Sequence, residues 1–135
     1  MKYLLDTNVC VDLLRSNPAV VQRASRMSPS DCVISAITLY ELRAGALKST
    51  KPEREIKRVN LLAGTIRVLV FDSDTASAAA QVRIATPKKG HPIGPYDILI
   101  AAQALQFELV MVTNNVRVFE RVPGLDVEDW RSASD

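Results

Sequence analysis

Short apolar runs alternate along this chain with longer segments of helical pattern, and this alternation limits the possible folds. Strands are predicted over 2–5, 32–35, 66–71 and 109–112, with a last short strand near 125–127. Helices are predicted between them, over 9–15, 17–27, the segment carrying Glu41, 52–63, the Ala-rich segment before Pro87, and 96–107. Strands that alternate with helices form a parallel sheet covered on both faces. We therefore expect an α/β fold, a three-layer α/β/α sandwich around a central parallel sheet of four or five strands.

Capping and breaking residues mark several of the predicted helix ends. A side-chain oxygen at the residue before a helix accepts a hydrogen bond from the first turn, and glycine commonly follows the last turn. The predicted caps are Asn8, Asn17 with Pro18 after it, Ser35 or Thr38, and Asp72, and the predicted stop of the 52–63 helix is Gly64. Three of the seven prolines lie in 87–95, which predicts a functional loop.

Composition and length indicate one ordinary globular domain over residues 1–135. The chain is 47% hydrophobic and 24% charged, which is typical of soluble proteins. No apolar run approaches the roughly 20 residues of a spanning helix. The apolar run at the start is too short for a signal peptide and ends at Asp6. We expect a cytoplasmic protein with no membrane role, and the net charge of +2 permits a nucleic-acid substrate without requiring one.

The cysteines and the single histidine argue against a zinc site. Cys10 and Cys32 lie in apolar stretches, where a free cysteine behaves as a small buried hydrophobe. No two cysteines are spaced as in a zinc-binding loop, and His91 has no second histidine. The sequence also lacks a GxSxG motif, so nucleophilic hydrolysis by serine or cysteine is not indicated.

Three acidic residues lie in or beside apolar runs, where burial of their neighbours should partly desolvate them. They are Asp6, Glu41 and Asp97. Three such carboxylates, if they meet, cannot all stay ionised without a cation. Mg²⁺ or Mn²⁺ is the usual cation for carboxylate ligands, and phosphodiester hydrolysis is the usual chemistry of such a site.

The predicted topology gives these acids a common location. Asp6 and Asn115 each follow a strand, and ligands of parallel sheets bind at the carboxyl ends of the strands. The helices that bear Glu41 and Asp97 could start near the same edge. Thr113, at the end of the same strand as Asn115, could bond either the backbone or a catalytic carboxylate.

Each candidate also has a purely structural interpretation. Asp6 could cap a helix, although Thr7 or Asn8 could do so instead; Glu41 could be an exposed helix acid, and Asp97 could be a first-turn acid favoured by the helix dipole. Asn115 could be only a turn residue, and Asp12 is expected to be a polar position of the first helix. Lys88, Lys89 and His91 could form a solvated loop or contact phosphate.

Five segments together resemble one known family across essentially the whole chain. They are Leu5–Asn8, Thr38–Leu42, Ile93–Ala102, Val112–Phe119 and the tail Val122–Trp130. In this order and spacing they are similar to the PIN domain, specifically to the VapC toxins of bacterial toxin–antitoxin pairs and the related FitB proteins. The resemblance implies a PIN-like sandwich and a metal-dependent endoribonuclease that cleaves structured RNA, often transfer RNA, to inhibit translation.

The resemblance also implies site residues and partners. Asp6, Glu41 and Asp97 match the acids that hold Mg²⁺ or Mn²⁺, whereas Asn115 stands where many PIN domains have a fourth acid, which favours a single metal ion. Thr113 is a further candidate catalytic residue. The expected partners are a second copy of the chain in a homodimer and a VapB-type antitoxin. Operator DNA is expected to be reached only through that antitoxin.

Three other functions are alternatives to a metal-dependent ribonuclease. A PIN fold without catalytic power, serving as an RNA-binding or regulatory module, stays open because of Asn115. A phospho-receiver domain needs paired acids after its first strand and a lysine after its last, and Asp6 stands alone. A DNA-directed flap-type nuclease needs additional substrate-clamping elements for which this chain is too short.

Overall fold

A parallel five-stranded sheet organises the computed structural model, which describes residues 1–88, 90 and 93–131. The strands are β1 (Tyr3–Leu5), β2 (Cys32–Ser35), β3 (Arg67–Leu69), β4 (Val110–Val112) and β5 (Val127–Glu128). The helices are α1 (Thr7–Leu14), α2 (Pro18–Ala24), α3 (Ala36–Lys48), α4 (Pro52–Thr65), α5 (Ser73–Ala85), α6 (Pro95–Gln106) and α7 (Val116–Phe119), with a 3₁₀ turn over Pro29–Asp31. The predicted α/β fold is confirmed, with five strands.

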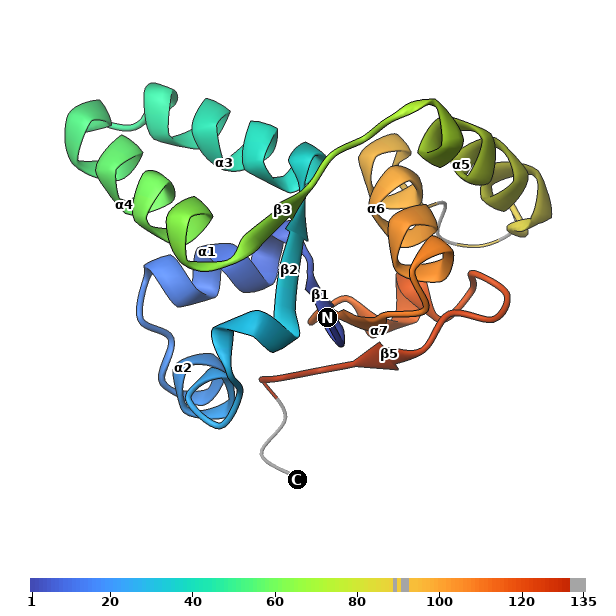
Figure 1. Cartoon of the computed structure of the whole chain (residues 1–135), viewed down its shortest axis with the longest axis horizontal. Helices are drawn as coiled ribbons and strands as arrows, with labels where there is room; N and C mark the ends of the chain where they lie inside the picture. Colours follow the sequence, from blue (N-terminus) through green and yellow to red (C-terminus); the bar gives the residue numbers. More distant parts are fainter. Residues whose placement is uncertain (89, 91–92, 132–135) are drawn as a thin grey trace.

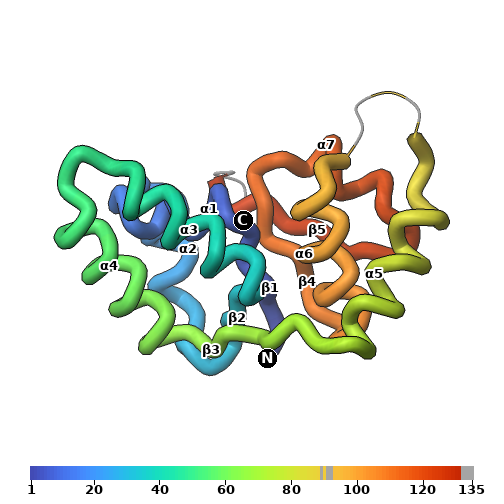
Figure 2. The backbone as a smooth tube through the Cα atoms, turned by 90° about the horizontal axis from the view of Figure 1, so that it is seen from above, coloured from blue at the N-terminus to red at the C-terminus, as the bar shows by residue number. Residues whose placement is uncertain are grey.

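Helices cover both faces of the sheet, as Figure 1 shows with α1 to α4 on one side and α5 and α6 on the other. The view from above in Figure 2 separates the same two groups of helices. Each face has its own core, because successive side chains of a strand point to opposite faces. Leu5 packs among the residues of α1 to α4, whereas Leu4 packs against α6 and α7.

The strand order places the neighbouring strands β1 and β4 at the point where the chain changes direction across the sheet. The order is β3-β2-β1-β4-β5, so the chain runs outward one way from β1 to β3 and the other way from β4 to β5. Leu4 pairs with Val33 on one side and Met111 on the other. The carboxyl ends of β1 and β4 therefore form the topological switch point at which parallel sheets bind ligands.

Most predicted helix starts agree with the structure, and the first is a correction. Asn17, Ser35 and Asp72 cap α2, α3 and α5 by accepting hydrogen bonds from first-turn backbone N–H groups. Asn8 was predicted to cap the first helix, but this helix begins at Thr7, two residues earlier, and Asp6 is its cap. Position alone did not distinguish them, since both are good capping residues.

Other boundaries differ where strand pairing or tertiary contacts decide them. The helix predicted to stop at Gly64 continues to Thr65, and the strand after it covers only Arg67–Leu69, the residues that pair with β2. The second helix ends at Ala24 rather than residue 27. The short helix α7 was not predicted. Cys10 and Cys32 are free and buried, as predicted.

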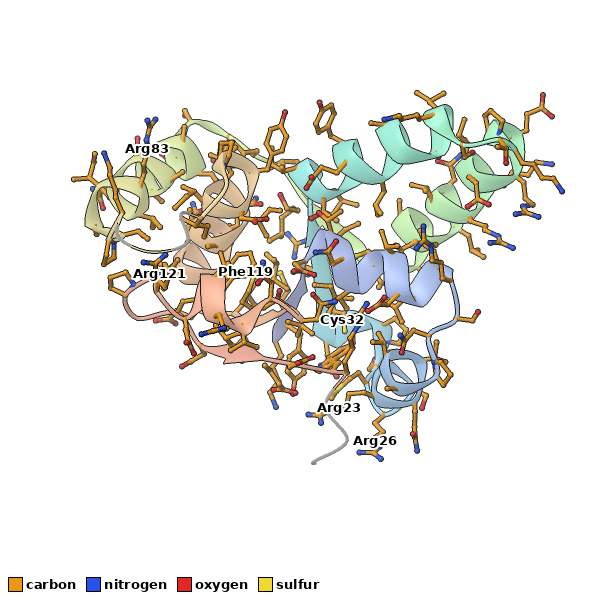
Figure 3. The ribbon with its side chains drawn as sticks, turned by 180° about the vertical axis from the view of Figure 1, so that it is seen from behind. Arg23, Arg26, Cys32, Arg83, Phe119 and Arg121 are labelled. Carbon is orange, nitrogen blue, oxygen red and sulfur yellow. The ribbon has the colours of Figure 1, made fainter. Side chains whose placement is uncertain are left out.

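The C-terminal segment is tied to α1 and α2 by buried and polar contacts. Trp130 is 1% exposed and packs edge-to-face on Tyr3, with ring centroids 5.6 Å apart. Its Nε1 donates to Glu128 Oε1 at 3.0 Å, and Glu128 also accepts from Arg23. Figure 3 labels Arg23, which lies on α2. These contacts therefore fasten residues 128–131, which we call the C-terminal strap, to the first helices of the fold.

Asp12 lies under this strap. It is a polar position of the first helix, as predicted, and its side chain is buried and accepts two hydrogen bonds from Arg131, each of 2.7 Å. A buried carboxylate requires such a partner.

Among the described residues, no helix is long and apolar enough to cross a membrane.

Candidate active site

Asp6 lies at the switch point, with both carboxylate oxygens engaged. It follows β1 and caps α1, so Oδ1 accepts from the backbone N–H of Val9 at 2.8 Å. Oδ2 accepts from the hydroxyl of Thr113 at 2.5 Å. Asp6 is only 3% exposed, and burial raises its pKa to about 6 despite these two hydrogen bonds. Asp6 is therefore the cap of α1, and its carboxylate lies at the switch point.

Thr113 holds the Asp6 carboxylate from the neighbouring strand. It follows β4, is fully buried, and accepts a hydrogen bond from the backbone N–H of Asn115 at 3.0 Å while donating to Asp6. It therefore makes both of the bonds considered for it from the sequence. Asn115 itself is exposed, and its side chain makes no capping bond to α7.

Glu41 is held on α3 by a residue next to Asp6. The hydroxyl of Thr7 lies 2.7 Å from Glu41 Oε1 and 3.2 Å from the hydroxyl of Thr38. Ser35 at the end of β2 starts α3, so the helix carries Glu41 over the carboxyl edge of the sheet. Glu41 remains half-buried, and one of its oxygens accepts from Thr7.

Asp97 completes the acidic group from the other helical layer. It lies in the first turn of α6, which starts with Pro95 after the extended residue Gly94. Burial, and secondarily the charge of Glu41, raise the pKa of Asp97. The charge of Asp97 in turn contributes to raising the pKa of Asp6. Asp97 thus lies within electrostatic range of both Asp6 and Glu41.

Arg131, a cation whose charge interacts with that of Asp6, is already paired with Asp12. The hydrogen bonds from its guanidinium to Asp12, and to a smaller extent the charge of Asp6, raise the pKa of Arg131. Burial therefore disfavours the negative charge of Asp6 and of Asp97, since it raises the pKa of both carboxyl groups. A bound cation would offset this charge.

The donor set fits a hydrated Mg²⁺ or Mn²⁺ ion. Within residues 1–88, 90 and 93–131, no three histidine, cysteine, aspartate or glutamate side chains form a cage around one point. Mg²⁺ does not need such a cage, because it keeps several waters and binds proteins through one or two carboxylates. Asp6 and Asp97 supply carboxylates of this kind, and Glu41 lies close enough for its charge to act on Asp97.

A groove leads away from the acids between α1, α3 and α4. It has a volume of about 420 Å³, with Thr7 and Glu41 at its wall. The far part carries mostly basic side chains, together with Glu55: Arg15, Lys51, Arg54 and Arg58. The groove therefore joins an acidic end to a basic end.

Comparison with known proteins places this geometry in a family. The model of the PIN domain matches residues 3–125. The chain belongs to the PIN-domain family. It is 42% identical to a curated protein of Salmonella typhimurium named tRNA(fMet)-specific endonuclease VapC, over 96% of this chain and 98% of that one. It is 35% identical to Ribonuclease VapC1 of Haemophilus influenzae, over 96% and 98% of the two chains.

Solved structures agree with this assignment to the VapC branch of PIN domains. The crystal structure of DNA-bound VapBC from Salmonella typhimurium matches with a TM-score of 0.88 and 41% identity, covering 96% of this chain and 98% of that one. FitAcB from Neisseria gonorrhoeae matches with a TM-score of 0.84 and 30% identity, covering 95% and 97%. The resemblance to VapC and FitB proteins is thus confirmed.

Sequence reasoning missed the residues that orient the acids. Thr7 bonds Glu41 across 34 positions, and Thr38 lies beside both. The signal was a threonine directly after Asp6 and another three residues before Glu41, which places the second hydroxyl on the same helix face.

Of the loop residues predicted to contact phosphate or solvent, Lys89 and His91 lie outside the described residues, and Lys88 lines a separate cavity between α5 and α6.

Asn115 offers a direct test of how the site holds a cation. Asn115→Asp would add a carboxylate beside Thr113, and we expect Mg²⁺ to bind about 10-fold more tightly because one more negative charge faces the ion. Calorimetric titration of Mg²⁺ would measure this. Asn114→Asp adds the same charge one residue earlier and is the matched control. Equal affinities for the two variants and the wild type would place Asn115 outside the metal site.

Proposed function

We propose that this protein is the toxin of a type II toxin–antitoxin pair and a Mg²⁺- or Mn²⁺-dependent endoribonuclease of structured RNA. The substrate class we assign is transfer RNA, with initiator tRNA the first to test, because the similar Salmonella protein is named for that specificity. The observation that carries the proposal is that Asp97 lies within electrostatic range of both Asp6 and Glu41, while no basic side chain of the described residues forms an ion pair with any of the three acids. Cleavage of transfer RNA would inhibit translation.

In this mechanism the three acids would hold the metal ion, and threonine hydroxyls orient two of the acids. When bound, the ion would lower the pKa of a coordinated water and offset charge on the phosphate. Thr113 keeps one oxygen of Asp6 fixed, and the Val9 N–H fixes the other. Thr7 fixes Glu41 from the residue next to Asp6. These bonds preorganise the carboxylates, so the group need not rearrange when substrate arrives.

Cleavage of a transfer RNA pool tests the proposal. The purified protein, freed of antitoxin, should cut RNA in Mg²⁺ and not in excess EDTA, and sequencing of the new RNA ends would identify the tRNA and the cut position. Asp97→Asn, which changes one carboxylate to an amide of the same size, should lose cleavage and keep its circular dichroism spectrum. Equal cleavage by wild type and this variant would contradict the proposal.

One alternative has a specific observation in its favour. Asn115 replaces a fourth acid and is exposed, which would suit a catalytically weak PIN-fold module that binds RNA or serves regulation. Such a module would bind transfer RNA without producing new ends. The same experiment therefore separates the two functions.

The proposed assembly is a homodimer of a single PIN domain over residues 1–135, silenced in the cytoplasm by a VapB-type antitoxin. Operator DNA would be reached only through that antitoxin, as the VapBC and FitAB complexes bound to DNA suggest. We assign the groove lined by Glu41 and Arg58, with a volume of about 420 Å³, as the place that receives an extended or helical antitoxin tail. A basic side chain of that tail would be attracted to the acids.

Competition with Mg²⁺ tests this mode of inhibition. We expect a peptide of the C-terminal tail of the cognate antitoxin to inhibit cleavage about 10-fold less strongly when Mg²⁺ is raised 10-fold, because the basic side chain and the ion need the same volume. Inhibition constants at several Mg²⁺ concentrations would measure this. Indifference to Mg²⁺ would mean that the peptide blocks RNA sterically. A tightly bound peptide that leaves cleavage unchanged would contradict both versions.

A further inference from the structure

Two tyrosines form an exposed aromatic pair that the mechanism above does not use. Tyr40 of α3 is 55% exposed and Tyr96 of α6 is 44% exposed. Their ring centroids lie 5.7 Å apart at an interplanar angle of 70°, and their hydroxyl oxygens are 3.5 Å apart. The aromatic contact rather than the hydroxyl contact therefore fixes the pair, since 3.5 Å is long for an O–H···O bond.

The pair lies directly beside the acidic site. Tyr40 precedes Glu41 and Tyr96 precedes Asp97, so each ring is carried by the residue next to a proposed metal ligand. The two rings thus lie at the margin of the group of acids, where the two helical layers meet.

The geometry of the pair leaves aromatic surface available. In an edge-to-face pair, the ring that presents its edge keeps both of its faces free of its partner. An RNA strand that approaches three carboxylates is repelled by them, so affinity next to the acids must come from uncharged contacts or from the metal ion. Unstacked bases in RNA loops bind by stacking on such aromatic side chains.

We infer that Tyr40 and Tyr96 form a stacking platform for an unpaired base next to the phosphodiester that is cut. This inference rests on the proposed function and deepens it, because it assigns the RNA a single-stranded nucleotide at the cleavage point. The platform is sequence-tolerant, since every base has an aromatic face, and it selects for flexible loops over paired stems. The two tyrosines are positioning residues for substrate rather than catalytic groups.

Four variants test the platform in the cleavage assay. Tyr96→Ala and Tyr40→Ala should each raise KM by about 5-fold to about 100-fold with little change in kcat, the range expected for loss of one stacked base. Tyr96→Phe keeps the ring and should retain wild-type KM. The matched control is Phe107→Ala, which removes an aromatic ring that is 40% exposed at the opposite end of α6 and should leave KM unchanged.

A fluorescent base reports stacking directly. A loop oligonucleotide with 2-aminopurine next to the mapped cut should be quenched on binding Asp97→Asn protein, which cannot cut it, and the quenching should be lost when Tyr96→Ala is added. Wild-type cleavage with unchanged KM and quenching in the alanine variants would overturn the inference alone. A change in oligomeric mass in those variants, measured by light scattering, would also overturn it by assigning the pair to a contact between copies. Failure of the wild type to cut any RNA would overturn the proposed function as well.

Discussion

Asp6→Asn is expected to give a protein that no longer cleaves RNA and yet is more stable at pH 7 without metal. Asparagine is as good a helix cap as aspartate, so its Oδ1 can still accept from the N–H of Val9. Its amide can face the hydroxyl of Thr113, which then acts as an acceptor. The substitution therefore removes the buried charge while both local hydrogen bonds can persist.

The size of the gain follows from the pKa of Asp6. Burial raises this pKa from 3.8 to about 6, so ionising Asp6 in the folded protein costs about 3 kcal/mol relative to the unfolded chain at pH 7. We expect Asp6→Asn to recover about 1–3 kcal/mol of unfolding free energy, measured by urea denaturation in EDTA. Activity in the RNA assay should fall below detection.

The pH dependence has a definite sign. Between pH 3.8 and about 6 the folded wild type binds more protons at Asp6 than the unfolded chain, so its stability falls as pH rises through this window. The advantage of Asp6→Asn should therefore be full at pH 7 and vanish near pH 4. Adding Mg²⁺ should stabilise the wild type and not the variant, because the ion binds only the intact carboxylates. A variant less stable than wild type at pH 7 would contradict this account.

Trp130→Ala is expected to be the most destabilising single change in the strap. Trp130 is almost fully buried and packs against Tyr3 of the central strand, so removing it leaves a large cavity beneath the sheet. Substitutions of this type cost about 3–5 kcal/mol of unfolding free energy. The indole donor to Glu128 is lost as well, which weakens the connection to Arg23 on α2.

The measurement should use circular dichroism, because Trp130 is the only tryptophan and its fluorescence disappears in the variant. Trp130→Phe keeps an aromatic ring in the cavity and should recover more than half of the loss, which separates packing from the hydrogen bond to Glu128. A loss below about 1 kcal/mol in Trp130→Ala would show that the strap is not part of the folded core.

Several features follow from the sequence because neighbouring residues decide them. The apolar run before Asp6 makes β1 a buried strand, and Asp72 before an Ala-rich segment starts α5. The apolar character of α6 on all sides predicted its burial. These are properties of local periodicity and capping, so the strand–helix alternation and the edge that carries Asp6 and Asn115 could be derived without coordinates.

Only the tertiary structure determined which polar groups meet. Thr7 and Glu41 are 34 positions apart, and Asp12 and Arg131 are 119 apart, so no periodicity links them. The sequence placed the three acids at one edge but could not show that Thr113 would fix Asp6 or that Asp12 would be buried. Hydrogen bonds and burial of this kind depend on how the strands and helices pack, and packing brings together residues whose separation along the chain carries no signal.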